Sequence, residues 1–130
     1  MHAKHANRTR LNELSKIVIG CAFTVLNTLG AGFLEKVYEN ALPLELRKTG
    51  LAVAQQHGAA VTYDGTVVGE YFVDLLVEGS VLVELKTVKA LVDVHRLQCV
   101  NYLKATDLNL CMLLNFGNSR MEIKRVVSGL

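Results

Sequence analysis

Three charged residues stand inside two apolar segments in the middle of the chain. Asp74 lies in a run rich in valine, leucine and aromatic residues, and Glu84 and Lys86 lie in the next such run. Both runs are typical of strands, and the Gly-Ser pair at 79–80 predicts a tight turn between them. Because side chains alternate along a strand, Glu84 and Lys86 point to the same face. The resulting hairpin is predicted to bring Asp74 beside Glu84 and Lys86.

These charges point to chemistry, because burying an unpaired charge in an apolar strand costs several kcal/mol. Two carboxylates about 4 Å apart repel each other by roughly 4 kcal/mol at an effective dielectric constant near 20. Lys86 relieves part of this repulsion, and a divalent cation relieves more. Carboxylate oxygens together with a backbone carbonyl suit Mg²⁺ or Mn²⁺ and not zinc. On the residues alone, the alternative is a solvated cluster of charges at a sheet edge.

The surrounding segments predict the elements that must hold these residues. Helical and strand patterns follow one another in the order α-α-β-β-β-α-β-β, which predicts an α/β fold with a mixed central β-sheet flanked by helices. Pro43 falls inside the second helix and predicts a kink or a break there. Asp64 and Gly65 predict a second hairpin turn. The expected helices cover about Asn12–Leu29, Leu34–Thr49 and Val92–Ala105, and the expected strands cover about Leu51–Tyr63, Val67–Glu78, Val81–Lys86, Leu108–Phe116 and Met121–Val127.

Composition limits the class of protein. The length of 130 residues fits one domain, and 51% hydrophobic with 20% charged residues excludes intrinsic disorder. A net charge of +2 gives no global attraction to nucleic acid or membrane. Glycine and polar residues interrupt the uncharged stretch from Ile17 to Leu34, so we expect a helix with one buried face and no membrane span. Three cysteines without a CxxC motif argue against a disulfide framework or zinc knuckle and indicate buried thiols in a reducing compartment, the cytoplasm.

The N-terminal segment differs from the rest of the chain. Residues 1–11 are basic and lack the apolar core of a signal peptide. We therefore expect a flexible arm over residues 1–11 and a single domain over residues 12–130.

Three motifs follow one another along that domain. Residues 32–38 match the pattern G-x-x-E-x-x-Y, and Asp74 is followed by the Glu-Leu-Lys run at 84–86. The segment 95–103 then carries a Q-x-x-x-Y motif. In this order and spacing, from about residue 13 to 127, the chain resembles the GxxExxY proteins, a branch of the PD-(D/E)XK nuclease superfamily. The resemblance implies a restriction-endonuclease-like core.

The resemblance also implies roles for individual residues. Asp74 and Glu84 match the metal-binding acids, with the backbone carbonyl of Leu85 as a third ligand. Glu35 matches an additional acid that reaches the metal directly or through water. Lys86 matches the catalytic lysine that orients the attacking water or stabilises charge on the phosphate. The other matching positions are catalytic Gln98 and the supporting residues Tyr38, His95 and Tyr102.

Each of these positions has a structural alternative. Tyr38 can be a helix-packing residue whose hydroxyl helps to hold Glu35. Glu35 can be a first-turn acid that the helix dipole stabilises. His95 can cap the third helix, and Tyr102 can be a core residue.

The preferred function is a Mg²⁺-dependent (or Mn²⁺-dependent) phosphodiester hydrolase acting on DNA, with RNA as the alternative substrate. The runner-up is a catalytically inactive nucleic-acid-binding module of the same fold, or a subunit that needs a partner. Small nucleases of this type often pair to cut two strands, so a homodimer is compatible with this function. Candidate phosphate contacts, each with a solvated surface charge as its alternative, are Lys89, Arg96 and Lys104.

Overall fold

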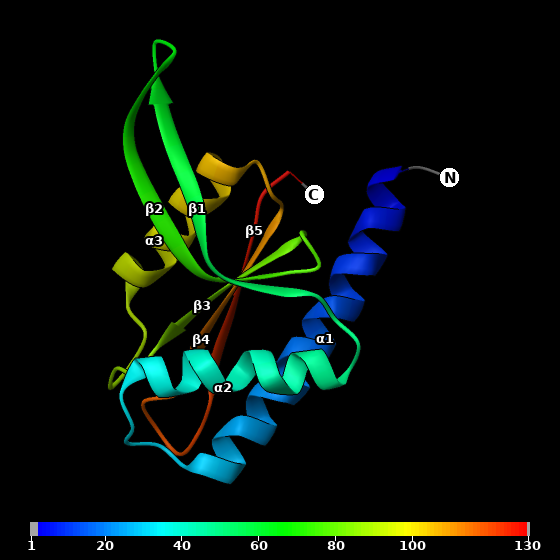
Figure 1. Cartoon of the computed structure of the whole chain (residues 1–130), viewed down its shortest axis with the longest axis vertical. Coiled ribbons are helices and arrows are strands. Elements are labelled where there is room, and N and C mark those ends of the chain that lie inside the picture. The colour runs from blue at the N-terminus through cyan, green and yellow to red at the C-terminus, as the bar shows by residue number, and fades with distance from the viewer. Residues whose placement is uncertain (1–2, 130) are drawn as a thin grey trace.

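A computed structural model describes residues 3–129 of the chain, with side chains from residue 7 onward. In this range a five-stranded sheet has the strand order β1-β2-β3-β4-β5. Strands β3 and β4 are parallel, and the other neighbouring pairs are antiparallel. The expected mixed sheet is therefore confirmed (Figure 1). The elements are α1 (Ala3–Leu29), α2 (Glu35–Lys48), β1 (Val53–Tyr63), β2 (Thr66–Val77), β3 (Val81–Lys86), α3 (Asp93–Thr106), β4 (Leu110–Asn115) and β5 (Glu122–Val127).

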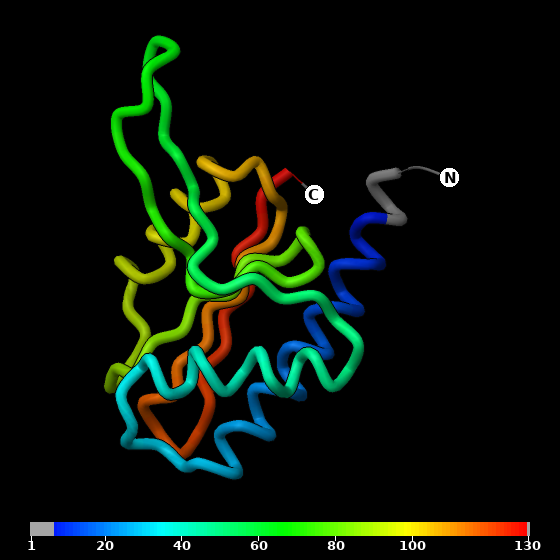
Figure 2. Tube along the Cα trace, in the orientation of Figure 1, coloured from blue at the N-terminus to red at the C-terminus, as the bar shows by residue number. Residues whose placement is uncertain are grey.

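Helices cover both faces of the sheet. Helix α3 connects the parallel strands β3 and β4, and its buried residues pack with one side of the sheet. Helices α1 and α2 pack together against the other side. The chain trace shows the β1–β2 ribbon extending beyond α1 and α2 (Figure 2). The result is three layers, helix on sheet on helix.

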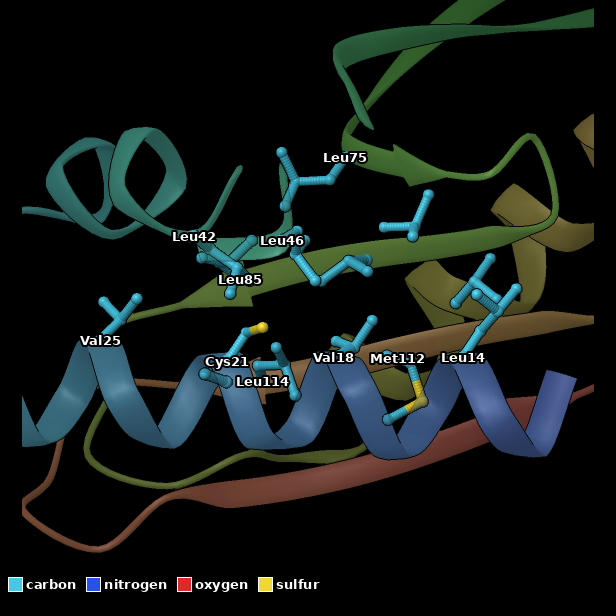
Figure 3. Packing of buried hydrophobic residues seen from close by; sticks show 14 of the residues in the cluster. Leu14, Val18, Cys21, Val25, Leu42, Leu46, Leu75, Leu85, Met112 and Leu114 are labelled. Carbon is cyan, nitrogen blue, oxygen red and sulfur yellow. The ribbon is translucent and has the colours of Figure 1, made fainter. Parts of the chain in front are cut away.

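Strand β3 shows how the sequence alternation builds these layers. Val81, Val83 and Leu85 contribute to the core on the α1 and α2 side, and Leu82 contributes to the core on the α3 side. Glu84 has the same parity as Leu82 and faces α3. Burying one large aliphatic side chain stabilises the fold by roughly 1.5–3 kcal/mol. Figure 3 shows the core on the α1 and α2 side of the sheet. Its labelled residues come from α1, α2 and the sheet: Leu14, Val18, Cys21, Val25, Leu42, Leu46, Leu75, Leu85, Met112 and Leu114.

The start of α1 corrects the sequence prediction. The helix begins at Ala3 and not near Asn12, so a flexible arm is wrong for residues 3–11. Leu11 is only 1% exposed, one turn before Leu14 in the same apolar stripe, and this burial extends the helix toward the N-terminus. Residues 1 and 2 lie outside the described residues.

Helix α2 excludes a break, which was one of the two outcomes predicted at Pro43. It runs without a break from Glu35 to Lys48 with Pro43 inside it. A proline in a helix interior removes one backbone hydrogen bond and costs about 3 kcal/mol. Pro43 is buried with Leu42 and Leu46, and this packing offsets the cost.

Two further expectations concern cysteines and membranes. Cys21, Cys99 and Cys111 are free and buried, as predicted. Within the described part of the chain, no helix is long and apolar enough to cross a bilayer. The uncharged stretch after Ile17 instead forms the second half of α1 and the loop that follows it.

Candidate active site

Strands β2 and β3 separate at the point where the two acids lie. Their pairing runs from Val77↔Val81 to Leu75↔Val83 and ends there. Beyond it, Asp74 Oδ2 accepts a hydrogen bond from the amide of Leu85 at 2.8 Å, and Glu84 Oε1 accepts one from the amide of Asp74 at 3.2 Å. Side-chain carboxylates thus take the place of ladder hydrogen bonds at the opening of the strand pair.

Both acids are buried and Lys86 lies beside them. Asp74 is 7% exposed and Glu84 is 4% exposed. Lys86 Nζ lies 3.6 Å from Glu84 Oε2. The hydroxyl of Tyr102 donates to the same Glu84 oxygen at 3.3 Å. The predicted convergence of Asp74, Glu84 and Lys86 is present, and Tyr102 of α3 also holds Glu84.

Burial disfavours the charged forms of the acids in this cluster. Burial, and next the charge of Asp74, raise the pKa of Glu84 to about 8. Burial also raises the pKa of Asp74. Glu35, at the first position of α2, has a pKa raised by its own burial and by Asp74, with Lys86 opposing. Glu35 is therefore close enough to Asp74 to interact with its charge. Lys86 alone does not neutralise the cluster.

The backbone of β3 supplies a further oxygen at this opening. The carbonyl of Lys86 accepts a hydrogen bond from Phe116, on the β4 side, whereas the amide of Leu85 donates to Asp74. Consecutive peptide groups of a strand point to opposite edges, so the carbonyl of Leu85 faces the same edge as Asp74. Two carboxylates and one peptide carbonyl form an all-oxygen donor set that fits a hard divalent cation such as Mg²⁺ or Mn²⁺.

Glu35 does not join Asp74 and Glu84 in a group of three side chains that could hold one metal ion. Among the described residues, no three Asp, Glu, His or Cys side chains are grouped so that they hold one ion. Mg²⁺ commonly binds through one or two carboxylates and keeps several waters. The arrangement of the two carboxylates and the carbonyl fits this mode of binding.

Gln98 and Tyr102 share one face of α3, as their spacing predicts. Both line a pocket of about 310 Å³ together with Tyr71 and His95. His95 Nδ1 accepts a hydrogen bond from the amide of Val92 at 3.0 Å, so it fixes the start of α3. Of the two interpretations of His95, the structure favours capping.

Tyr38 holds the loop before α2 and not the Glu35 carboxylate. Its hydroxyl donates to the carbonyl of Gly30 at 2.6 Å and accepts from the amide of Phe33 at 3.2 Å. Its ring stacks on Phe116 with ring centroids 4.7 Å apart. The expectation of a contact between the Tyr38 hydroxyl and Glu35 is therefore wrong. Tyr38 instead holds the loop that leads into α2, at whose first position Glu35 lies.

A family comparison agrees with this geometry. Residues 12–126 match the model of the PD-(D/E)XK nuclease superfamily. The chain belongs to this superfamily. No curated protein and no solved structure matches it. The restriction-endonuclease-like fold expected from the sequence is therefore confirmed at the level of the superfamily.

The candidate phosphate-binding cations of this PD-(D/E)XK protein differ in their surroundings. Arg96 pairs with Asp93 at 3.0 Å on the exposed face of α3, which neutralises part of its charge. Lys89 and Lys104 are exposed. Lys104 lines a pocket of about 360 Å³ between the β1–β2 ribbon and α3. Among Lys89, Arg96 and Lys104, Lys104 is therefore the candidate cation that lines a described pocket.

Glu39 and Gln56 also belong to the surroundings of the site, and neither was predicted from the sequence. Glu39 is 3% exposed and accepts hydrogen bonds from Lys36, Gln55 and Gln56. Gln56 also donates to Asp74 Oδ1 at 3.3 Å. A signal for Glu39 existed, because it continues the buried stripe of Leu42 and Leu46 at helical spacing.

Asn115, at the end of β4, was missed as well. It is completely buried and organises the loop that follows Lys86. Its Oδ1 accepts from the amides of Val88 and Gly117, and its Nδ2 donates to the carbonyl of Val88 and to Glu122. A side chain added at Gly117 would collide with the backbone of Val88, so this close approach requires glycine.

Proposed function

We propose that this PD-(D/E)XK protein is a Mg²⁺-dependent nuclease that hydrolyses phosphodiester bonds in DNA. The observation that carries the proposal is the convergence of Asp74, Glu84 and Lys86 where β2 and β3 separate. Buried acids without a cation cost folding free energy, and a site that accepts this cost is typical of function.

We further assign the chain to the GxxExxY branch. Gly32 has a φ of 114°, a conformation that favours glycine, in the loop that leads to Glu35. Tyr38 ties the same loop back to Gly30. The three motif positions therefore act together to place one acid at the rim of the site.

The chain's residues divide the chemistry between them. Asp74, Glu84 and the Leu85 carbonyl would hold the cation, which when bound lowers the pKa of water and offsets phosphate charge. Lys86 places its ammonium group beside Glu84, where it stabilises charge that develops on the phosphate. Tyr102 orients Glu84 by its hydrogen bond, and Gln98 lies one turn away toward the neighbouring pocket.

Cellular context and assembly follow from the same features. The three buried free thiols suit a cytoplasmic protein. The described residues of one chain form one such site, so cutting both strands of a duplex in one encounter calls for two copies, and we propose a homodimer on DNA.

Cleavage assays test the function directly. Plasmid, linear duplex, single-stranded DNA and RNA are incubated with the protein in Mg²⁺, Mn²⁺ or EDTA, with Asp74→Asn as the control for contaminating nucleases. We expect metal-dependent cleavage of DNA by the wild type only. DNA binding in Ca²⁺ without cleavage in any metal would instead support the nucleic-acid-binding module. Cleavage of RNA alone would correct the substrate class.

A further inference from the structure

Gln56 has a left-handed backbone in the middle of a strand. Its φ is 53°, inside β1. The other described non-glycine residues with positive φ are Asp64 and Glu78 in the hairpin loops and Asp107 at the C-terminal cap of α3. Turns and caps commonly require this conformation, whereas a strand interior does not. Strain of this kind persists where the surroundings hold it, and it concentrates at functional sites.

The strand register places Gln56 opposite Asp74. The flanking pairs are Gln55↔Leu75 and His57↔Val73. Gln56 Nε2 donates to Asp74 Oδ1 at 3.3 Å and to Glu39 Oε1 at 3.0 Å. Both acceptors are carboxylate oxygens, so the amide presents its two hydrogens and not its oxygen. The side chain is therefore a bridge between two acids on different elements.

With the hydrogen bond from Gln56, both oxygens of the Asp74 carboxylate are held. Oδ2 accepts the amide hydrogen of Leu85, and Oδ1 accepts the hydrogen from Gln56. Glu39 anchors the other end, because it is buried and also accepts from Lys36 at 2.9 Å and Gln55 at 3.0 Å. A continuous hydrogen-bonded path thus runs from α2 through β1 to the acid on β2.

We propose that Gln56 is a positioning residue that sets the orientation of the Asp74 carboxylate from the anchored carboxylate of Glu39. In the proposed function, on which this part of the inference rests, the fixed orientation prepares Asp74 to bind the divalent cation. Partners that orient metal ligands typically contribute 10- to 100-fold to metal affinity or activity. Gln56 acts through Asp74 and does not itself need to touch the substrate.

Gln56→Gly is the variant that separates positioning from structure. It deletes the bridge and relieves the left-handed backbone, since glycine adopts this conformation freely. The matched control is Gln55→Ala, which removes hydrogen bonds to Glu39 and Asn40 but leaves Asp74 untouched. Both residues are exposed, so neither change opens a cavity.

Three measurements are made on each protein: Tm, amide hydrogen exchange of Leu85 by NMR without metal, and Mn²⁺ affinity by calorimetry. For Gln56→Gly we expect a Tm equal to or above that of the wild type, faster exchange at Leu85, and a Mn²⁺ affinity lower by about tenfold. For Gln55→Ala we expect wild-type exchange at Leu85 and wild-type Mn²⁺ affinity.

Unchanged Leu85 exchange and Mn²⁺ affinity in Gln56→Gly would overturn the proposal, and so would equal losses in both variants. If Gln56→Gly does not fold, Gln56→Asn is measured in its place, because asparagine tolerates the left-handed backbone but is too short to bridge. A wild type that binds no Mn²⁺ contradicts the proposed function, and Leu85 exchange then decides the positioning role by itself.

Discussion

A glutamate lies at each end of the β2–β3 hairpin, and the two have different surroundings. The closed end is the turn after β2, and the open end is where the two strands separate at Asp74. At the closed end, Glu78 Oε2 accepts from the amide of Ala52 at 2.6 Å, and Oε1 pairs with Arg10 at 3.1 Å near solvent. At the open end, Glu84 is buried next to Asp74, and its pKa is raised to about 8 by burial and by that neighbour. Only a short apolar ladder separates the two ends.

This difference shows which charges serve the fold. The closed end satisfies its carboxylate with a cation and a backbone amide, so the charge supports the loop. The open end collects more negative charge than Lys86 offsets, and it therefore needs a proton or a cation. Such a cluster lowers the free energy of unfolding, and proteins typically retain this cost at functional sites.

The largest expected contrast is catalytic. Asp74→Asn should lower the rate of DNA cleavage by at least about 10³-fold, because it removes a charged oxygen donor at the open end. Glu78→Gln, the same kind of change at the closed end, should leave the rate within about twofold, since it is far from any transition-state charge. Plasmid cleavage in Mg²⁺ measures both, and equal loss in the two variants would remove the distinction between the ends.

Lys86→Met tests whether the lysine serves chemistry or folding. Methionine keeps much of the aliphatic stem and deletes the charge. We expect native circular dichroism, retained DNA binding in Ca²⁺, and cleavage slowed by at least about 10²-fold. Cleavage at the wild-type rate would assign the activity elsewhere. A failure to fold would make Lys86 chiefly a structural partner of the two acids.

The pH dependence of stability should also differ between the ends. The pKa of Glu84 is raised from 4.5 to about 8, so the folded state binds the proton more tightly than the unfolded state. Its contribution to stability is complete below about pH 4.5 and is lost as the pH rises toward 8. Asp74 and Glu35, whose pKa values are also raised, act in the same direction.

We therefore expect the free energy of unfolding in EDTA to fall by a few kcal/mol between pH 5 and 8.5, since one unit of pKa shift corresponds to about 1.4 kcal/mol. Glu84→Gln should remove most of this fall, and Glu78→Gln should not. Urea unfolding at several pH values measures it. Saturating Mg²⁺ should flatten the dependence, because the cation competes with the protons. A flat profile in EDTA would show that the open end carries no excess charge.

The smallest expected effect is at the closed end itself. Arg10 and Glu78 form a partly exposed pair, and such pairs contribute about 0–1 kcal/mol. Arg10→Ala should lower the free energy of unfolding by less than about 1 kcal/mol and leave cleavage unchanged. A loss as large as that expected for a buried charge would place the closed end in the same class as the open one.

The sequence predicted those parts of the site that depend on short-range rules. Strand alternation placed Glu84 and Lys86 on one face, and the hairpin placed Asp74 beside them, as found. The bounds of β3 also agree with the prediction. Such features follow from the backbone of one hairpin and need no knowledge of the rest of the chain.

The features that the sequence did not predict depend on distant contacts. Gln56 has an ordinary strand context in the sequence, whereas its left-handed backbone occurs together with side-chain hydrogen bonds to Glu39 and Asp74, which are distant in the chain. The early start of α1 depends on the burial of Leu11 in the core. Of the kink or break expected at Pro43, the break is absent, and the burial of this residue offsets the local cost of proline in a helix.

The central claim is that the open end of the hairpin binds the divalent cation. Crystals grown with Mn²⁺ and measured near the manganese absorption edge test it most directly. The account predicts an anomalous difference peak in contact with the carboxylates of Asp74 and Glu84 and the carbonyl of Leu85, and none beside Glu78. A peak only elsewhere, or no peak at saturating Mn²⁺, would contradict it.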